Sequence, residues 1–359
     1  MSAPLDSLVV PIVGAPMAGG PSTVDLAVAV SGAGGLGILA GANLAVDVLA
    51  ERVVAVQHAL GGAPSGVNLF LPTAVPDPAP DLGGHLAALE RWAHRYGVQR
   101  GEARWDDDSW RAKVELLVTR PVPVVTFHFG CPPAGVVDAL HAVGSEVWTT
   151  VTSRAEAAQA ATAGLDALVV QGREAGGHRG TFSNPAASST DALDPDDDPG
   201  LLALLRLVQG VTDLPLVAAG GLVHGADVAA VLVAGARAAQ LGSAFLLTPE
   251  AGTSAPHRAA VAADRPTAVT RAFSGRPARG VRNELLDELT ATAPAAYPHL
   301  NRVSQPVRAA AAAAGDESAV AMWAGQTHHL ARAVPAAQVV SRVVAEARVA
   351  LAGGAASLG

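Results

Sequence analysis

The chain has 359 residues, of which 50% are hydrophobic, 16% are charged and only 4% are aromatic. Its net charge is −8, and Lys and Arg are scattered along it, which argues against binding to nucleic acid or to an anionic membrane. Cys131 is the only cysteine, so an intrachain disulfide is excluded. No signal-peptide pattern opens the sequence, and no uncharged apolar run reaches about 18 residues, so we expect a soluble cytoplasmic protein.

Short apolar runs alternate with alanine-rich helical stretches along most of the chain. The apolar runs predict eight strands, at residues 9–13, 36–39, 66–71, 122–127, 146–151, 167–171, 216–219 and 238–241. The stretches between them predict helices at residues 23–31, 46–60, 110–119, 134–143, 154–163, 201–208 and 226–234. Eight strands separated by helices indicate an α/β fold, the TIM (β/α)8 barrel, with a doubly wound open sheet as the alternative.

We expect residues 1–245 to form the barrel. Residues 246–359 contain further alanine-rich helical stretches and predict a C-terminal helical extension, packed on the barrel in the same structural unit. Residues 72–109, with a predicted helix near 85–96, and the aspartate-rich segment 181–199 interrupt the alternation. Both follow strands, so in a barrel both lie at the C-terminal mouth, where active sites are built.

Gly32, Gly34 and Gly37 match the G-x-G-x-x-G pattern of dinucleotide-binding folds. That fingerprint requires a strand before the glycines and a helix after them. Here a helical stretch comes first and an apolar run follows. The glycines therefore predict a tight turn between a helix and a strand, and we expect no Rossmann-type NAD site.

Residues 171–180, with the sequence Gln-Gly-Arg-Glu-Ala-Gly-Gly-His-Arg-Gly, follow a predicted buried strand. Glycines allow the backbone to approach a flat ligand closely. Gln171 offers an amide, and His178 has the side chain whose proton moves most easily near neutral pH. A glycine-rich turn with a solvated histidine is the alternative for this segment taken alone.

Polar and glycine residues also end the other predicted strands. The amides of Asn68, Gln171 and Gln240 suit the mixed edge of a flavin, and Met17 offers a soft floor for its ring. The backbone at Gly220, Gly221, Gly242 and Ser243 suits a phosphate, which barrels often bind after strands seven and eight. Together these groups indicate FMN. His128 is either a core histidine or a functional one, and no group of residues has metal-ligand spacing.

These motifs resemble those of the FMN-dependent bacterial nitronate monooxygenases, a family formerly grouped as 2-nitropropane dioxygenases. The resemblance covers roughly residues 8–332. It rests on the segments 15–20, 34–37, 68–70, 126–130, 171–180, 218–221, 240–243, 272–280 and 323–326.

The resemblance implies FMN at the barrel mouth and oxidation of an alkyl nitronate, such as propionate 3-nitronate, by O2 to a carbonyl compound plus nitrite or nitrate. Electrons would pass singly through a flavin semiquinone, without NAD(P)H. It implies that His178 is catalytic and that Tyr297 stands at a substrate position. The implied FMN contacts are Asn68, Gln171, Gly176, Gly221, Gln240, Leu241, Gly242 and Ser243. The chain has only two tyrosines, so other aromatic contacts of the family are missing.

Several alternatives stay open at this point. His178 could act as a neutral base on a nitroalkane or, as imidazolium, hold a nitronate anion. Arg276 and Arg279 could bind a substrate carboxylate or the FMN phosphate, but tying the extension to the barrel is favoured. The rival functions are an NAD(P)H-dependent FMN enoyl-thioester reductase and a flavin-binding barrel without redox turnover. The sequence is compatible with a homo-oligomer.

Overall fold

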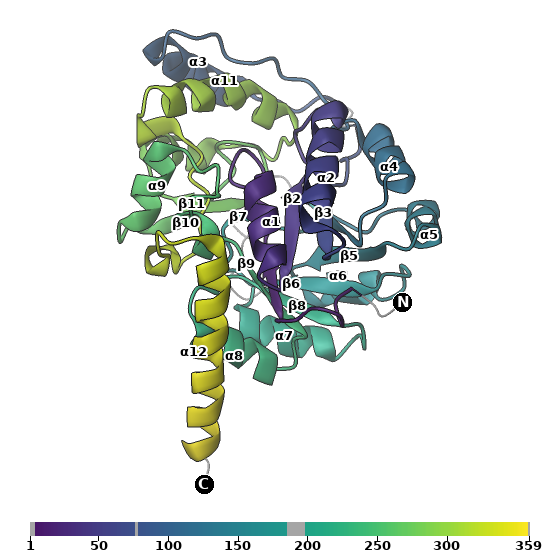
Figure 1. The fold of residues 1–359 in the computed structure, drawn as a ribbon. Coiled ribbons are helices and arrows are strands. Elements are labelled where there is room, and N and C mark those ends of the chain that lie inside the picture. The colour runs from purple at the N-terminus through teal and green to yellow at the C-terminus, as the bar shows by residue number, and fades with distance from the viewer. Residues whose placement is uncertain (1–3, 76–77, 185–197, 358–359) are drawn as a thin grey trace.

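A computed structural model describes residues 4–75, 78–184 and 198–357 of the chain. Eight parallel strands close into a barrel in the order β1-β2-β3-β4-β5-β6-β8-β9 (Figure 1). Their bounds are β1 Ile12–Gly14, β2 Leu36–Ala40, β3 Ser65–Phe70, β4 Val124–His128, β5 Glu146–Val151, β6 Ala167–Gln171, β8 Leu216–Ala219 and β9 Ala238–Leu241. The predicted TIM barrel is therefore confirmed, and the open-sheet alternative is wrong.

The first strand begins later than the sequence predicts. Val9 is 84% exposed, and β1 starts only at Ile12. Pro11 precedes it and has no N–H to donate to a neighbouring strand, so regular pairing can begin only after this residue.

The helices that follow the strands pack on the outside of the barrel. They are α1 Val24–Gly32, α2 Val46–Leu60, α4 Trp110–Thr119, α5 Ala134–Ala142, α6 Arg154–Ala160, α7 Leu201–Gln209 and α8 Gly225–Val233, close to the predicted bounds. Hydroxyl side chains fix the starts of two of them: Thr23 accepts from Leu26 N at 3.0 Å, and Ser153 from Glu156 N at 3.2 Å. The predicted helix near 85–96 is present as α3 Gly83–Arg95, and residues 185–197 of the aspartate-rich segment lie outside the described residues.

A glycine turn joins α1 to β2, as the order of these elements predicts. Gly34 has φ +90°, a conformation that side-chain-bearing residues rarely adopt. A Cβ atom at Gly37 would lie 2.1 Å from the Ala27 carbonyl oxygen, so the helix and the strand touch through their backbones. These glycines therefore serve close packing of a helix on the sheet.

Apolar side chains fill the lower interior of the barrel. This cluster includes Val13, Leu36, Ile38, Val124, Trp148, Val169 and Val217. Trp148 is fully buried, and its indole N–H donates to Glu146 Oε2 at 2.9 Å. The polar strand ends therefore stand above a closed apolar floor.

The chain after β9 forms an extension with two parts. It contains η2 Ser243–Phe245, α9 Ala255–Ala262, β10 Thr267–Thr270, β11 Ala278–Val281, α10 Glu284–Leu289, η3 Thr290–Thr292, α11 His299–Ala313, η4 Glu317–Ala319, η5 His328–Leu330 and α12 Ala336–Ser357. The first part has its own apolar cluster, in which Leu285 and Leu300 join Trp92 of α3. The second part, α12, packs with Val339 and Val343 into the core that surrounds the barrel, beside α8 (Figure 1).

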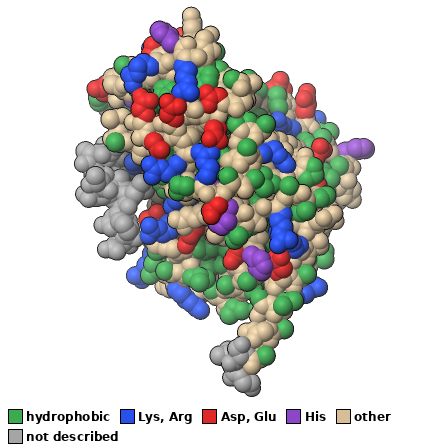
Figure 2. Space-filling model, turned by 90° about the vertical axis from the view of Figure 1, so that its left-hand side faces the viewer, with side chains coloured by type: hydrophobic (Ala, Val, Ile, Leu, Met, Phe, Trp, Pro, Cys, Tyr) green, Lys and Arg blue, Asp and Glu red, His purple; other side chains and the backbone are tan. Residues whose placement is uncertain are grey.

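The sequence predicted the helices of this extension but not its sheet. Strands β10 and β11 form a three-stranded antiparallel sheet with β7 Gly177–His178, a two-residue strand that leaves the barrel after β6. No helix within the described residues is long and apolar enough to cross a membrane. Acidic and basic side chains are interspersed over the face in Figure 2.

Candidate active site

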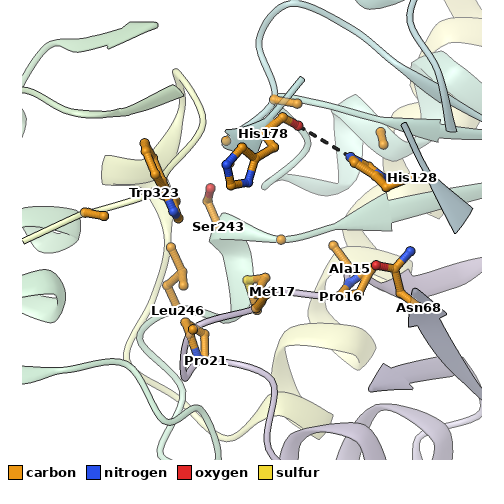
Figure 3. Close-up of a pocket in the computed structure, with 18 of the residues that line it drawn as sticks. Ala15, Pro16, Met17, Pro21, Asn68, His128, His178, Ser243, Leu246 and Trp323 are labelled. Carbon is orange, nitrogen blue, oxygen red and sulfur yellow. Dashed lines mark hydrogen bonds between the residues drawn. The ribbon is translucent and has the colours of Figure 1, made fainter. Parts of the chain in front are cut away.

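A cavity of about 430 Å³ opens at the carboxyl ends of the barrel strands, bounded on one side by the C-terminal extension (Figure 3). Most residues singled out in the sequence line it: Met17, Asn68, His128, Gln171, Gly176, His178, Gly220, Gly221, Gln240, Gly242 and Ser243. The structure therefore brings residues from six strand ends to one place.

Two predicted site residues lie elsewhere. The Leu241 side chain is fully buried in the core outside the barrel, because neighbouring residues on a strand point to opposite faces and Gln240 points inward. Any contact of Leu241 with a ligand would have to come from its backbone. Tyr297 lines a second cavity, of about 350 Å³, and its ring centroid lies 6.1 Å from that of His178, which lines the first.

The backbone at one side of the cavity is shaped by glycines. Gly220 and Gly221 follow β8 with φ of +122° and +70°, so the chain turns there without side chains that would fill the space. Gly242 follows β9 opposite Met17, whose sulfur would lie 3.8 Å from a Cβ atom at this glycine. These segments leave main-chain groups facing a narrow slot.

The side-chain amides of Asn68 and Gln171 already make some of their hydrogen bonds within the protein. The amide nitrogen of Asn68 donates to Thr126 Oγ1 at 2.9 Å, while its oxygen has no hydrogen-bond partner among the described residues. Gln171 Oε1 accepts from Arg179 Nη1 at 3.0 Å and from Gly180 N at 2.9 Å, and its Nε2 donates to the His178 carbonyl at 2.9 Å. Asn68 thus offers an acceptor to a ligand, and Gln171 offers one remaining N–H.

His178 is held between the barrel and the extension. Its backbone is in β7, where His178 pairs with Ala278 of β11. Its ring Nε2 lies 2.9 Å from Ser274 Oγ, and that hydroxyl lies 3.2 Å from the Arg276 carbonyl oxygen. Nδ1 of His178 has no hydrogen-bond partner in the described part of the chain. The long-range sheet therefore sets where this imidazole stands.

Burial keeps the imidazoles of His178 and His128 neutral. Burial, with smaller contributions from the charges of His128, Arg276 and Arg308, lowers the pKa of His178 to about 3. Burial likewise lowers the pKa of His128 to about 4, although its Nε2 lies 3.5 Å from the His178 carbonyl oxygen, a contact that raises it. Neutral imidazoles are therefore the forms present at pH 7.

Aromatic rings surround the imidazole of His178. The ring centroids of Trp323, Phe129, Phe70 and Tyr297 lie 5.6, 5.9, 6.0 and 6.1 Å from it. Burial raises the pKa of the Tyr297 hydroxyl, so this residue is a neutral phenol. Apolar walls of this kind limit the access of water to the imidazole, in line with its lowered pKa.

The segment after Trp323 joins the glycine loops to the extension. Gly325 N donates to Ser243 Oγ at 2.9 Å, and Thr327 Oγ1 donates to the Gly221 carbonyl at 2.8 Å. Glu174 accepts from Leu201 N at the start of α7, which is a structural role. The extension thus closes one edge of the cavity by contacts to both glycine turns.

Arg276 and Arg279 both contact the protein, in agreement with the favoured structural role. The Arg276 guanidinium lies 3.8 Å from the centre of the Phe129 ring and donates to the Thr181 carbonyl. Arg279 donates to the Arg173 carbonyl at 3.0 Å and to Thr267 Oγ1 at 3.1 Å.

Several polar cavity residues were given no role from the sequence. Among them, Ser254 and His257 come from the start of α9, Asn43 follows β2, and Arg308 comes from α11. One face of α11 lines the cavity with residues three or four positions apart, namely Asn301, Gln305, Arg308, Ala309 and Ala312. This helical spacing is the feature of the sequence that could have indicated them.

Comparisons with known proteins find similarity along almost the whole chain. The sequence model of the family "Nitronate monooxygenase" matches residues 4–346. A nitronate monooxygenase of Paraburkholderia phytofirmans is 38% identical over 96% of this chain and 93% of its own length. The solved nitroalkane oxidase of Streptomyces ansochromogenes superimposes with a TM-score of 0.90 at 42% identity, covering 98% of this chain and 99% of that one. FabK of Thermotoga maritima gives a TM-score of 0.75 at 25% identity, over 99% and 97% of the two chains.

Proposed function

Because this chain belongs to the nitronate monooxygenase family, an oxidoreductase family of flavoproteins, we propose that it oxidises alkyl nitronates with O2 by means of bound FMN. The products would be a carbonyl compound and nitrite or nitrate. The observation that carries the proposal is the neutral His178 imidazole, held at the wall of a slot lined by glycine backbone and amides.

The residues of the cavity fit FMN. When bound, FMN supplies the redox centre that takes electrons from the substrate and passes them to O2. The backbone at Gly220, Gly221, Gly242 and Ser243 would hold the phosphate without a charged side chain. The Asn68 oxygen, the free N–H of Gln171 and the Gln240 amide would meet the polar edge of the ring. Leu241 would contribute its backbone at most.

Ser274 gives His178 a defined proton arrangement. If the Ser274 hydroxyl donates to the Arg276 carbonyl, its oxygen accepts from His178 Nε2–H at 2.9 Å. The proton of a neutral imidazole is then on Nε2, and Nδ1 carries the lone pair. In this state His178 takes a proton at Nδ1.

A second candidate reaction follows from this state. A neutral nitroalkane must lose its α-proton before it becomes a nitronate, and Nδ1 of His178 is a base for that step. The likeness to a protein described as a nitroalkane oxidase supports this reaction. A nitronate has already lost that proton. With such a substrate the imidazole would take up a proton from solvent as the anion binds, and the imidazolium would then hold the nitro oxygens.

The proposal is tested by the absorbance spectrum of the purified protein, followed by addition of propionate 3-nitronate under air and under nitrogen. We expect a flavin spectrum, release of FMN on denaturation, O2 uptake under air and no sustained turnover under nitrogen. A flavin-loaded protein that consumes no O2 with any nitronate would instead support a binding barrel without redox turnover.

The reductase alternative has one observation in its favour, the likeness to FabK at 25% identity. Anaerobic mixing with NADH or NADPH separates the two functions. We expect slow or no bleaching of the flavin, whereas fast bleaching followed by reoxidation with an enoyl thioester would establish the reductase.

A further inference from the structure

One face of α11 brings a single full charge to the cavity. Among the described residues that line it, Arg308 is the only Lys, Arg, Asp or Glu. His178 lines the same cavity, and the charge of Arg308 adds to the lowering of the pKa of that imidazole by burial. A cation therefore faces the space in which a substrate of His178 would lie.

Arg308 has no carboxylate partner within the described chain. Its Nη2 donates to the Asn301 carbonyl at 3.0 Å and to Asn301 Oδ1 at 2.8 Å, and its Nε is buried without a partner. The nearby Arg302, by contrast, donates to Asp106 Oδ1 at 2.7 Å. Burial lowers the pKa of Arg308 to about 10, so the guanidinium stays charged at pH 7.

A buried cation without a counter-ion is unfavourable, and a bound anion relieves that cost by forming charge-assisted hydrogen bonds. We propose that Arg308 is the residue that binds the carboxylate of a substrate such as propionate 3-nitronate, and that it sets the preference for this substrate over simple alkyl nitronates. This inference rests on the proposed function, since it concerns the substrate that His178 and the flavin would act on.

Asn301 holds Arg308 in place for this role. Its Nδ2 donates to Asn43 Oδ1 at 3.2 Å, and the backbone N–H of Asn43 donates to both carboxylate oxygens of Asp108, at 3.1 and 3.0 Å. The Asn43 backbone has φ +60°, which asparagine tolerates better than most residues. The guanidinium is thus tied to the loop after β2.

This position separates Arg308 from the expected phosphate site. The glycine backbone follows β8 and β9, whereas Asn43 follows β2, and β1 lies between β2 and β9 in the barrel. Of the other buried arginines near His178, Arg179 is paired with Asp198 at 2.5 Å. Arg276 also has a buried Nε without a partner, but it lines the second cavity, where it packs on Phe129. Among these arginines, Arg308 is the one that lines the cavity of His178.

The test compares two nitronates of similar size. Propionate 3-nitronate carries a carboxylate where propyl-1-nitronate carries a methyl group. We expect R308M to lower the ratio of kcat/KM for the first over the second by at least about 30-fold, because losing one partner of a buried charge pair costs that much or more. R308K should recover part of the ratio. R111M removes an exposed arginine of α4, outside this cavity, and should shift the ratio by less than about threefold.

Three further readouts keep the inference open to refutation. An unchanged ratio in folded, FMN-loaded R308M and R308K would overturn it, and loss of FMN from both would assign Arg308 to the cofactor phosphate. Succinate, an unreactive analogue with a carboxylate in place of the nitronate, is titrated against the flavin absorbance. If the wild type oxidises no nitronate but binds succinate at least about tenfold more tightly than R308M, the proposed function fails and the carboxylate site stands.

Discussion

The barrel rim and the C-terminal extension line the same cavity by different means. The rim presents mainly backbone and amides at strand ends, as at Asn68, Gly221 and Gly242, together with the neutral imidazole of His128. The extension presents ionisable and aromatic side chains, among them Trp323 and Arg308. A rim without charged side chains suits the binding of a constant cofactor. The side chains of the extension lie outside the barrel and can differ between proteins that act on different substrates. His178 stands where the two regions meet, because β7 leaves the barrel to pair with β11.

The largest expected effect comes from removing the group at that junction. H178N should lower kcat/KM for neutral nitroethane by about 10²- to 10⁴-fold, because it removes the base for the α-proton. FMN should stay bound, since Gln171 and His128 contact the His178 main-chain carbonyl and not its ring. Steady-state kinetics and the flavin content of the purified variant check both parts.

Ethyl nitronate serves as the control substrate for H178N, since it has already lost that proton. We expect a loss on the order of tenfold there. Equal losses on the two substrates would show that His178 holds an anion and does not remove a proton. Near-normal turnover of both, with FMN bound, would exclude His178 from the mechanism.

The pH dependence of kcat/KM in the wild type tests whether His178, at the junction of rim and extension, acts as a neutral base. The active form of a base is the deprotonated one, and the pKa of His178 is lowered to about 3 by burial. The kcat/KM for nitroethane should therefore stay nearly constant from pH 7 down to pH 5 and fall only near pH 3 to 4. An imidazole with the ordinary pKa of about 6.5 would lose about 30-fold by pH 5. A fall of that size would show that the aromatic walls do not desolvate the ring.

A substitution at Gly176 should disrupt the contact between the rim and the extension. A Cβ atom at Gly176 would lie 2.5 Å from Ala324 C and from Gly325 N. G176A should therefore cost about 1–3 kcal/mol of unfolding free energy and weaken FMN binding. Urea unfolding with and without added FMN measures both effects.

The matched control for G176A is G135A in α5, where a Cβ atom would meet nothing within 4 Å. It should be neutral or stabilising by about 0.4–1 kcal/mol, with FMN affinity unchanged. If the two alanine variants had equal stability, the approach of the extension to β7 would be looser than these distances indicate.

The same contrast explains what the sequence could predict. The residues of the rim could be predicted from the positions of the strands alone. Parallel strands end at one edge of a barrel, and Asn68, Gln171 and Gln240 lie in or at the ends of apolar runs. Leu241 shows what such a prediction misses, because an apolar run does not say which way each side chain points. Its side chain points into the core outside the barrel, whereas that of Gln240 points into the cavity.

The cavity residues of the C-terminal extension could not be predicted from apolar runs. Strand β7 has two residues and pairs with β11, about 100 positions later in the chain, so no local apolar pattern marks it. Arg308 stands on a helix whose mixed face is also typical of a solvated surface. Its importance depends on the absence of a nearby carboxylate among the described residues, which is a property of packing.

The smallest expected effect concerns Ser274, the residue of the extension that lies against the His178 ring. As a positioning residue, it should change activity through the imidazole and not through the fold. S274A removes the acceptor for Nε2–H, and one neutral hydrogen bond is worth about 0.5–1.5 kcal/mol, so kcat/KM for nitroethane should fall roughly 2- to 10-fold. S274T keeps the hydroxyl and should restore most of the rate. S145A removes a buried hydroxyl that donates to the Val122 carbonyl at 2.7 Å, before β4 and β5 at the amino ends of the strands, and should lower stability without changing kcat/KM. If S274A and S145A had the same kinetic effect, Ser274 would act on packing alone and the proton of His178 would be placed by the ligand.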